Sequence, residues 1–184
     1  MPTNKGHHAI KNYLNELQKI VSCVATEVCY VHPNNSGRLV LAWSGAGMLE
    51  LGPIMLQRKN NSRLFVNIRQ EIQQPNARNN YLVSTKGYIY SILDAEKKDT
   101  VGFHYHPELD DDPITHPHIH VYADADRRFA DFNLHKRHIP SGRVALEDAI
   151  EWLIVELEVK ALRSNWQQIL QTTRKKFKRI STWS

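Results

Sequence analysis

The feature that most constrains this chain is a series of short apolar runs with a period of two, between residue 27 and about residue 122. β-branched and aromatic residues dominate these runs, as in strands that bury one face. Turn signals such as 33–37, 86–87 and 97–99 separate them and are only a few residues long. Parallel strands need crossovers of about a dozen residues or more, so the stretch predicts a largely antiparallel meander sheet. The expected strands are 28–31, 39–43, 48–56, 64–68, 81–84, 88–93, 101–106 and 118–122.

The period changes to 3.6 on both sides of the predicted sheet. Apolar residues recur every three or four positions in 8–24 and again in 146–157, which predicts two amphipathic helices. A third helix is expected at about 164–180, where Ser164 and Gln167 fit a capping box. The chain is therefore predicted to be a single α+β domain over residues 1–184: an N-terminal helix, a largely antiparallel meander sheet and two C-terminal helices.

Composition excludes two broad classes of protein. With 41% hydrophobic and 23% charged residues, the chain can form a core and is not expected to be disordered. No run approaches the roughly 18 apolar residues of a membrane span, so no membrane partner is expected. The only cysteines, Cys23 and Cys29, are too few for a disulfide framework, which favours a cytoplasmic location.

The net charge of +5 is concentrated at the C-terminal end. Seven Lys and Arg residues and no acidic ones follow Glu158, whereas the other 17 basic residues are outnumbered by 19 acidic ones. A confined basic surface favours a polyanionic partner, with RNA preferred over DNA. The candidate nucleic-acid-binding residues are Lys136, Arg137 and Arg143 in the polar segment 134–143, and Arg174, Lys175, Lys176, Lys178 and Arg179 in the last predicted helix.

Histidine is strongly clustered. Five of the ten histidines fall within residues 104–120: His104, His106, His116, His118 and His120. Positions two apart on a strand project from the same face. His104 and His106 should therefore share a face of one strand, and His116, His118 and His120 a face of the next. The intervening segment 107–115 carries four acidic residues and is long enough for a hairpin loop. If the two strands pair, up to five imidazoles could line one face.

Three chemistries suit such a cluster. In the first, His116, His118 and His120 bind zinc or another divalent metal and activate a water molecule. In the second, His104, His106, His118 and His120 supply a metal-free pair that takes a proton from a ribose hydroxyl and gives one to the leaving oxygen. In the third, a histidine attacks a nucleotide phosphate, as in the histidine-triad family, whose signature the segment 116–122 formally resembles. The interior Pro117 departs from that signature. Structural histidines are the alternative to all three, and the spacing does not decide among them.

The segment from His104 to Leu157 also resembles the TumE-like toxins of small bacterial toxin–antitoxin loci. The likeness is one of layout and covers about a third of the chain: histidine-bearing strands, His116-Pro117-His118-Ile119-His120, a turn with His138 and an amphipathic helix. The Arg-Tyr-Asp run associated with that family is replaced here by Gly102-Phe103-His104-Tyr105-His106. The resemblance implies a cytoplasmic bacterial protein that acts on RNA or in phage defence and is neutralised by an antitoxin or another subunit.

The leading hypothesis from the sequence is a nucleic-acid-directed enzyme, a small ribonuclease that uses the histidine cluster and a basic C-terminal helix. One alternative is a non-catalytic component of a protein–RNA or defence complex, in which the histidines are structural. Another is a metal-dependent hydrolase of a small phosphorylated substrate. A basic surface beside the histidines would favour the first hypothesis. A basic surface on the opposite side, together with a large exposed apolar surface, would favour the second.

Overall fold

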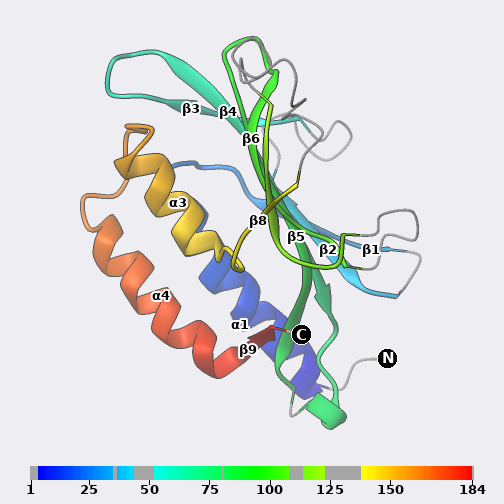
Figure 1. Cartoon of the computed structure of the whole chain (residues 1–184). Helices are drawn as coiled ribbons and strands as arrows, with labels where there is room; N and C mark the ends of the chain where they lie inside the picture. Colours follow the sequence, from blue (N-terminus) through cyan, green and yellow to red (C-terminus); the bar gives the residue numbers. More distant parts are fainter. Residues whose placement is uncertain are drawn as a thin grey trace.

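The computed structural model describes residues 4–34, 37–43, 52–79, 81–107, 114–122 and 138–183. It has the predicted α+β architecture, in which an N-terminal helix, a large sheet and two C-terminal helices follow one another (Figure 1). The helices are α1 (Asn4–Val21), α3 (Leu146–Val155) and α4 (Trp166–Ile180), with a short 3-10 helix at Ala77–Asn79. The strands are β1 (Cys29–Pro33), β2 (Leu39–Trp43), β3 (Ile54–Gln57), β4 (Arg63–Gln73), β5 (Val83–Leu93), β6 (Asp99–Tyr105), β7 (His118–Val121), β8 (Ile139–Pro140) and β9 (Ser181–Trp183).

The sheet follows the order β1-β2-β4-β5-β6-β7-β8, and each of these neighbours pairs antiparallel. The predicted antiparallel meander is therefore confirmed. Strand β3 pairs with the end of β4 that β2 leaves open. The three-residue strand β9, which the sequence did not predict, pairs parallel with the start of β5 and ties the end of α4 to the sheet. None of the described helices is long and apolar enough to cross a lipid bilayer.

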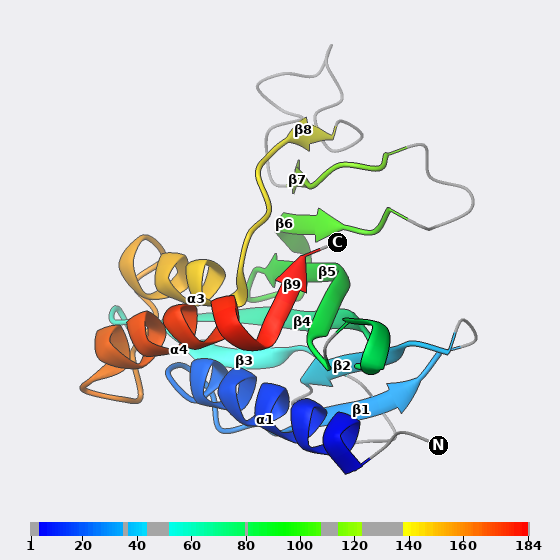
Figure 2. The same cartoon turned by 90° about the horizontal axis from the view of Figure 1, so that it is seen from below.

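All three helices lie on one face of the sheet, and β7 and β8 extend beyond them at one edge (Figure 2). Along β4 and β5 alternate side chains point toward the helices, because strand side chains project to opposite faces with a period of two. Complete burial of a large apolar side chain contributes roughly 1.5–3 kcal/mol. The core between sheet and helices includes Leu17, Ile20, Val66, Ile68, Ile72, Tyr88, Tyr90, Ile150, Leu153 and Leu170.

Two local predictions were wrong. The Lys86-Gly87 pair was expected to be a turn between two strands, but both residues lie inside the 11-residue strand β5, where Lys86 is the extra residue of a bulge opposite Glu71 and Ile72 of β4. Glycine is needed there for close approach, because a Cβ on Gly87 would lie 2.8 Å from the carbonyl oxygen of Tyr105. The capping box is absent as well: α4 begins after Asn165, with no side-chain cap hydrogen bond.

One buried charge stands out in the core. Glu147, in the first turn of α3, is 3% exposed, and its Oε1 atom has no hydrogen-bond partner among the described residues. Burial raises the pKa of this carboxyl from 4.5 to about 7. The folded protein therefore holds a proton that the unfolded chain releases, and its stability falls as pH rises from about 4.5 to beyond 7.

We predict that Glu147→Gln, which removes the charge and keeps the shape, stabilises the protein at pH 8 by about 3 kcal/mol. At pH 4 the carboxyl is protonated in both the folded and the unfolded states, so the gain should disappear. Urea unfolding at the two pH values measures the difference. The control is Glu156→Gln, an exposed position beyond the same helix. A gain that is equal at both pH values would contradict the assignment.

Candidate metal centre

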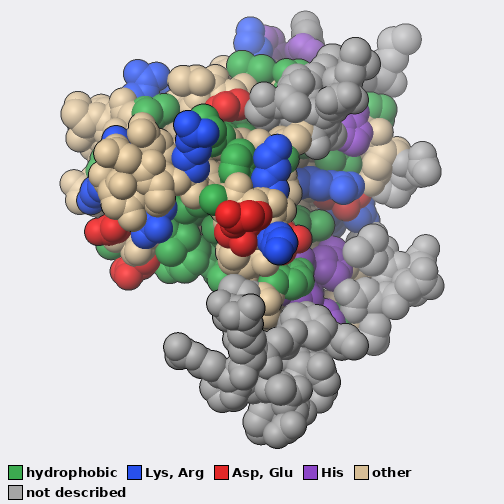
Figure 3. Space-filling view, turned by 90° about the horizontal axis from the view of Figure 1, so that it is seen from above, with side chains coloured by type: hydrophobic (Ala, Val, Ile, Leu, Met, Phe, Trp, Pro, Cys, Tyr) green, Lys and Arg blue, Asp and Glu red, His purple; other side chains and the backbone are tan. Residues whose placement is uncertain are grey.

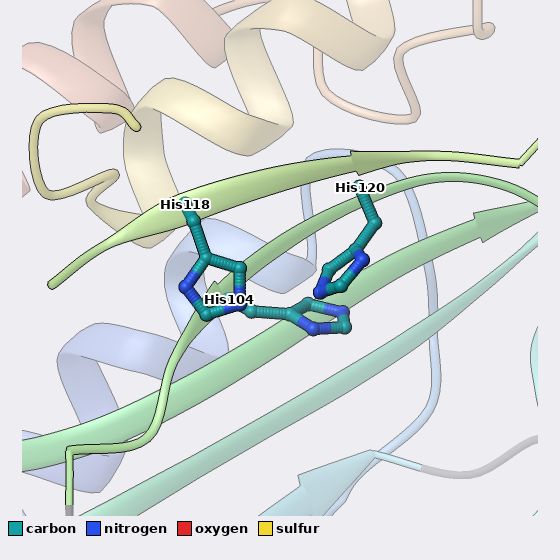
Figure 4. A group of neighbouring side chains, drawn as sticks. All are labelled: His104, His118 and His120. Carbon is teal, nitrogen blue, oxygen red and sulfur yellow. The ribbon is translucent and has the colours of Figure 1, made fainter. Parts of the chain in front are cut away.

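The pairing of β6 with β7 brings the histidines together. His104 lies opposite His118, and Gly102 lies opposite His120, so all three imidazoles project from one face of the sheet. Their neighbours Phe103 and Ile119 are also paired and point toward the helices, which places the histidines on the face away from the helices. Figure 4 shows the three side chains turned toward one another, one from β6 and two from β7.

The three imidazoles are spaced closely enough to hold one ion. A ligand nitrogen from each of His104, His118 and His120 lies within 4.8 Å of the others. A tetrahedral zinc ion with Zn–N bonds of about 2.0–2.1 Å requires nitrogens roughly 3.3 Å apart. Small side-chain rotations would therefore close the site around a metal.

Gly102 makes the space that His104 occupies. A Cβ atom at position 102 would lie 2.6 Å from Nε2 of His104, a distance that real side chains do not tolerate. The absence of a side chain thus lets the imidazole lie over the backbone of its own strand, toward His120. Nε2 of His104 is buried and has no hydrogen-bond partner among the described residues.

His118 is held by a backbone hydrogen bond. The residue is fully buried, and its Nδ1 lies 2.9 Å from the carbonyl oxygen of His116. Because a carbonyl can only accept, Nδ1 carries the proton and Nε2 carries the lone pair. Metal-binding histidines are commonly oriented in this way, with the second ring nitrogen donating to a carbonyl or carboxylate.

His116 itself does not join the converging group. It precedes β7, is exposed, and its ring centroid lies 6.2 Å from that of His118. Pro117 has no N–H to donate to a ladder, so the paired strand begins only at His118. The expected metal set of His116, His118 and His120 is therefore replaced by one in which His104 stands in place of His116.

Two further histidines surround the three. The ring of His106 lies 5.0 Å from that of His118, and the ring of His138 lies 4.5 Å from that of His120. In the sequence His138 belongs to the polar segment 134–143, and only the pairing of β8 with β7 brings it to the cluster. Tyr122 stacks on His120 at 5.4 Å and completes this side of the site.

The surroundings keep His104 neutral. Burial lowers the pKa of its imidazole from 6.5 to about 3, and the neighbouring His120, His106, His118 and His138 act in the same direction. A neutral imidazole has a lone pair on one nitrogen, which is the form that binds a metal. His104 is accordingly suited to be a ligand or a proton acceptor, and unsuited to be a proton donor at neutral pH.

The predicted nucleic-acid-binding residues of α4 lie away from the cluster. Helix α4 is on the opposite face of the sheet (Figure 1), and Arg174 is engaged by Asp148 and Glu151. Arg143 lies over the ring of Tyr105, 4.7 Å from its centroid, and donates to its hydroxyl at 3.0 Å. Figure 3 shows some His, Lys and Arg side chains exposed on one face of the molecule. Lys175, Lys178 and Arg179 are exposed, while Lys136, Arg137 and the acidic residues of 108–113 lie outside the described residues.

A groove of about 570 Å³ between α1 and α4 is lined in part by basic side chains of α4. The groove is lined by four cationic side chains, Lys19, Arg163, Lys176 and Arg179, and by a single carboxylate, that of Glu16. Glu16 pairs with Lys19 at 2.7 Å and with Lys176 at 3.1 Å. The remaining positive charge, together with polar neighbours such as Asn12 and Ser22, suits a phosphate-bearing ligand.

Comparison with protein-family models, with curated proteins and with solved structures found no match to this chain. The interpretation of the site therefore depends on its own geometry.

We predict that Gly102→Ala lowers zinc affinity at least tenfold, because the added methyl group displaces the His104 imidazole from the other two ligands. Titration against a chromophoric zinc chelator measures the affinity. Gly142→Ala is the matched control, since a Cβ there meets no atom within 4 Å. Unchanged zinc affinity in Gly102→Ala would show that His104 is not a zinc ligand.

Proposed function

We propose that this protein is a metal-dependent hydrolase of RNA phosphodiesters, with a zinc ion held by His104, His118 and His120. The observation that carries the proposal is the convergence of three imidazole nitrogens within 4.8 Å of one another on one sheet face. Catalytic zinc sites commonly use three protein ligands and keep the fourth position for water. Three histidines supply that arrangement without further residues.

The chemistry follows from the fourth position. His104, His118 and His120 would hold the ion, which would polarise a water molecule in its fourth position and make it a nucleophile toward phosphorus at neutral pH. Hydrolysis adds one water overall: the water oxygen replaces the leaving ribose oxygen on phosphorus, and a water proton is transferred to that leaving oxygen. His106 and His138 are the candidates for this proton transfer, because their rings contact those of His118 and His120.

Metal-free cleavage fits the site less well. It requires one imidazole to begin neutral and another to begin protonated. In this cluster His104 is kept neutral by burial and by the other imidazoles, and His118 is fully buried. These two histidines are therefore poor proton donors, whereas binding a shared metal ion requires only their lone pairs.

RNA as the substrate rests on the charge distribution. The groove between α1 and α4 offers an anchoring surface for the phosphate backbone. It lies on the helical side of the sheet, the placement that by itself suits a non-catalytic RNA-binding component, so it would hold only a distant part of the strand and would not position the scissile phosphate. The proposal of cleavage therefore rests on the imidazole cluster. The free thiols of Cys23 and Cys29 suit a cytoplasmic location. By the TumE-like resemblance, an antitoxin or other subunit would control the activity.

We predict that His104→Ala lowers zinc affinity and RNA cleavage by at least 100-fold, since two ligands hold zinc poorly. Metal content by elemental analysis and cleavage of a fluorescent RNA oligonucleotide measure the two effects. His32→Ala is the control, because His32 is an exposed histidine outside the cluster. RNA binding without cleavage by the zinc-loaded wild-type protein would favour the alternative of a non-catalytic RNA-binding component.

The groove generates a separate prediction. Arg163→Gln with Arg179→Gln should weaken binding of long single-stranded RNA and reduce the slope of log affinity against log salt by about 1.4, at about 0.7 for each phosphate that is no longer neutralised. Cleavage of a dinucleotide should not change, because it cannot span both faces. The charge-matched control is Lys59→Gln with Arg63→Gln, two exposed residues near the β3–β4 turn. An equal reduction in both pairs would indicate only a general effect of net charge.

A further inference from the structure

A second cavity lies on the helical side of the sheet, away from the histidines. It has a volume of about 310 Å³ and is enclosed by α1, α3, α4 and the central strands. Its floor is made of four buried polar side chains, and its mouth is formed by residues of α3 and α4 that face solvent. The floor residues are Tyr13, Gln70, Thr85 and Glu147.

Three of these four polar groups already satisfy one another. The hydroxyl of Tyr13 lies 3.2 Å from Oε1 of Gln70, to which it donates, and 3.0 Å from the hydroxyl of Thr85. The amide nitrogen of Gln70 donates to the hydroxyl of Tyr90. The carboxyl of Glu147 keeps an unused acceptor: it lines the cavity, is 3% exposed, and its Oε1 has no hydrogen-bond partner in the described part of the chain.

A buried carboxylate oxygen without a donor is costly, and the core would be more stable with an uncharged residue. Its position at the floor of a cavity indicates that a ligand supplies the missing donor. At the mouth, Asp148 is paired with Arg174 at 2.8 Å, whereas Lys178 makes no salt bridge with the described residues. The cavity thus offers an acceptor at its floor and a cation at its rim.

We propose that this cavity binds a guanine nucleotide, with the N–H edge of the base on Glu147 and the phosphate at Lys178. Guanine presents adjacent N–H donors on one edge, which suits a carboxylate, whereas adenine presents a donor beside an acceptor. The apolar walls of the cavity, from Leu17, Leu146 and Phe177, suit the faces of a planar ring.

The dimensions favour a nucleotide over a smaller ligand with the same end groups. A sphere of 310 Å³ is about 8 Å across, within the lower range of ligand sites. An amino acid also carries a donor and an anionic group, but they lie on neighbouring atoms. In a nucleotide, the donor edge of the base and the phosphate lie at opposite ends of the molecule, as Glu147 and Lys178 lie on the buried and the exposed parts of the cavity lining. This site is on the other face of the sheet from the metal centre, so it is independent of the proposed hydrolase activity.

Isothermal titration of the full chain with GMP tests the proposal. We expect saturable binding of GMP that is at least tenfold tighter than that of AMP. Glu147→Gln should weaken GMP binding at least tenfold, while the control Glu156→Gln, on an exposed carboxylate, leaves it unchanged. No binding of GMP at millimolar concentration, or equal binding by wild type and Glu147→Gln, would overturn the assignment.

An exposed position provides a second test that does not disturb the core. Lys178→Gln should weaken binding of GMP several-fold and leave binding of guanosine, which has no phosphate, unchanged. An equal weakening for both ligands would refute the role of Lys178 at the phosphate. His104→Ala should bind GMP like wild type, which separates this site from the metal centre: loss of cleavage with retained GMP binding affects only the hydrolase proposal.

Discussion

The alternation of side chains across the central strands determines where each functional group of this protein lies. Strands β4, β5 and β6 direct one set of residues toward the helices and the intervening set toward the opposite face. Tyr90, Phe103 and Ile119 are successive partners on the helical side, and His104 and His118 pair on the other. A slip of one residue would exchange the two sets, so the apolar core and the histidine cluster depend on the same register.

Both proposed sites contain groups that the fold alone does not favour. The proposed metal centre packs several imidazoles against one another, and the absence of a side chain at position 102 leaves room for that of His104. The cavity places a carboxyl of raised pKa against apolar walls. Such conflicts between local chemistry and stability are typical of functional sites, where a ligand supplies the interaction that the protein lacks. In the first case that ligand would be a cation, and in the second a hydrogen-bond donor.

The sheet separates the two kinds of chemistry. The histidine cluster lies on the face away from the helices, near the β7–β8 edge, whereas the basic groove and the cavity around Glu147 lie among the helices (Figure 2). A long RNA could contact the groove and reach the cluster only by passing around an edge of the sheet. In the proposed function, the basic C-terminal helix would therefore only anchor the RNA, and cleavage would belong to the histidines and the metal ion that they would hold.

The sequence by itself determined the fold class and the strands that carry the histidines, because the period of apolar residues reports which local structure buries them. It also located four of the five clustered histidines, since positions two apart must share a strand face. Only the tertiary structure brought in His138, exchanged His116 for His104 and placed α4 behind the sheet. These features depend on register and on which strands become neighbours, and no local pattern encodes such pairings between distant residues. The cavity around Glu147 has the same origin, because its lining comes from three helices and three strands that meet only in the folded chain.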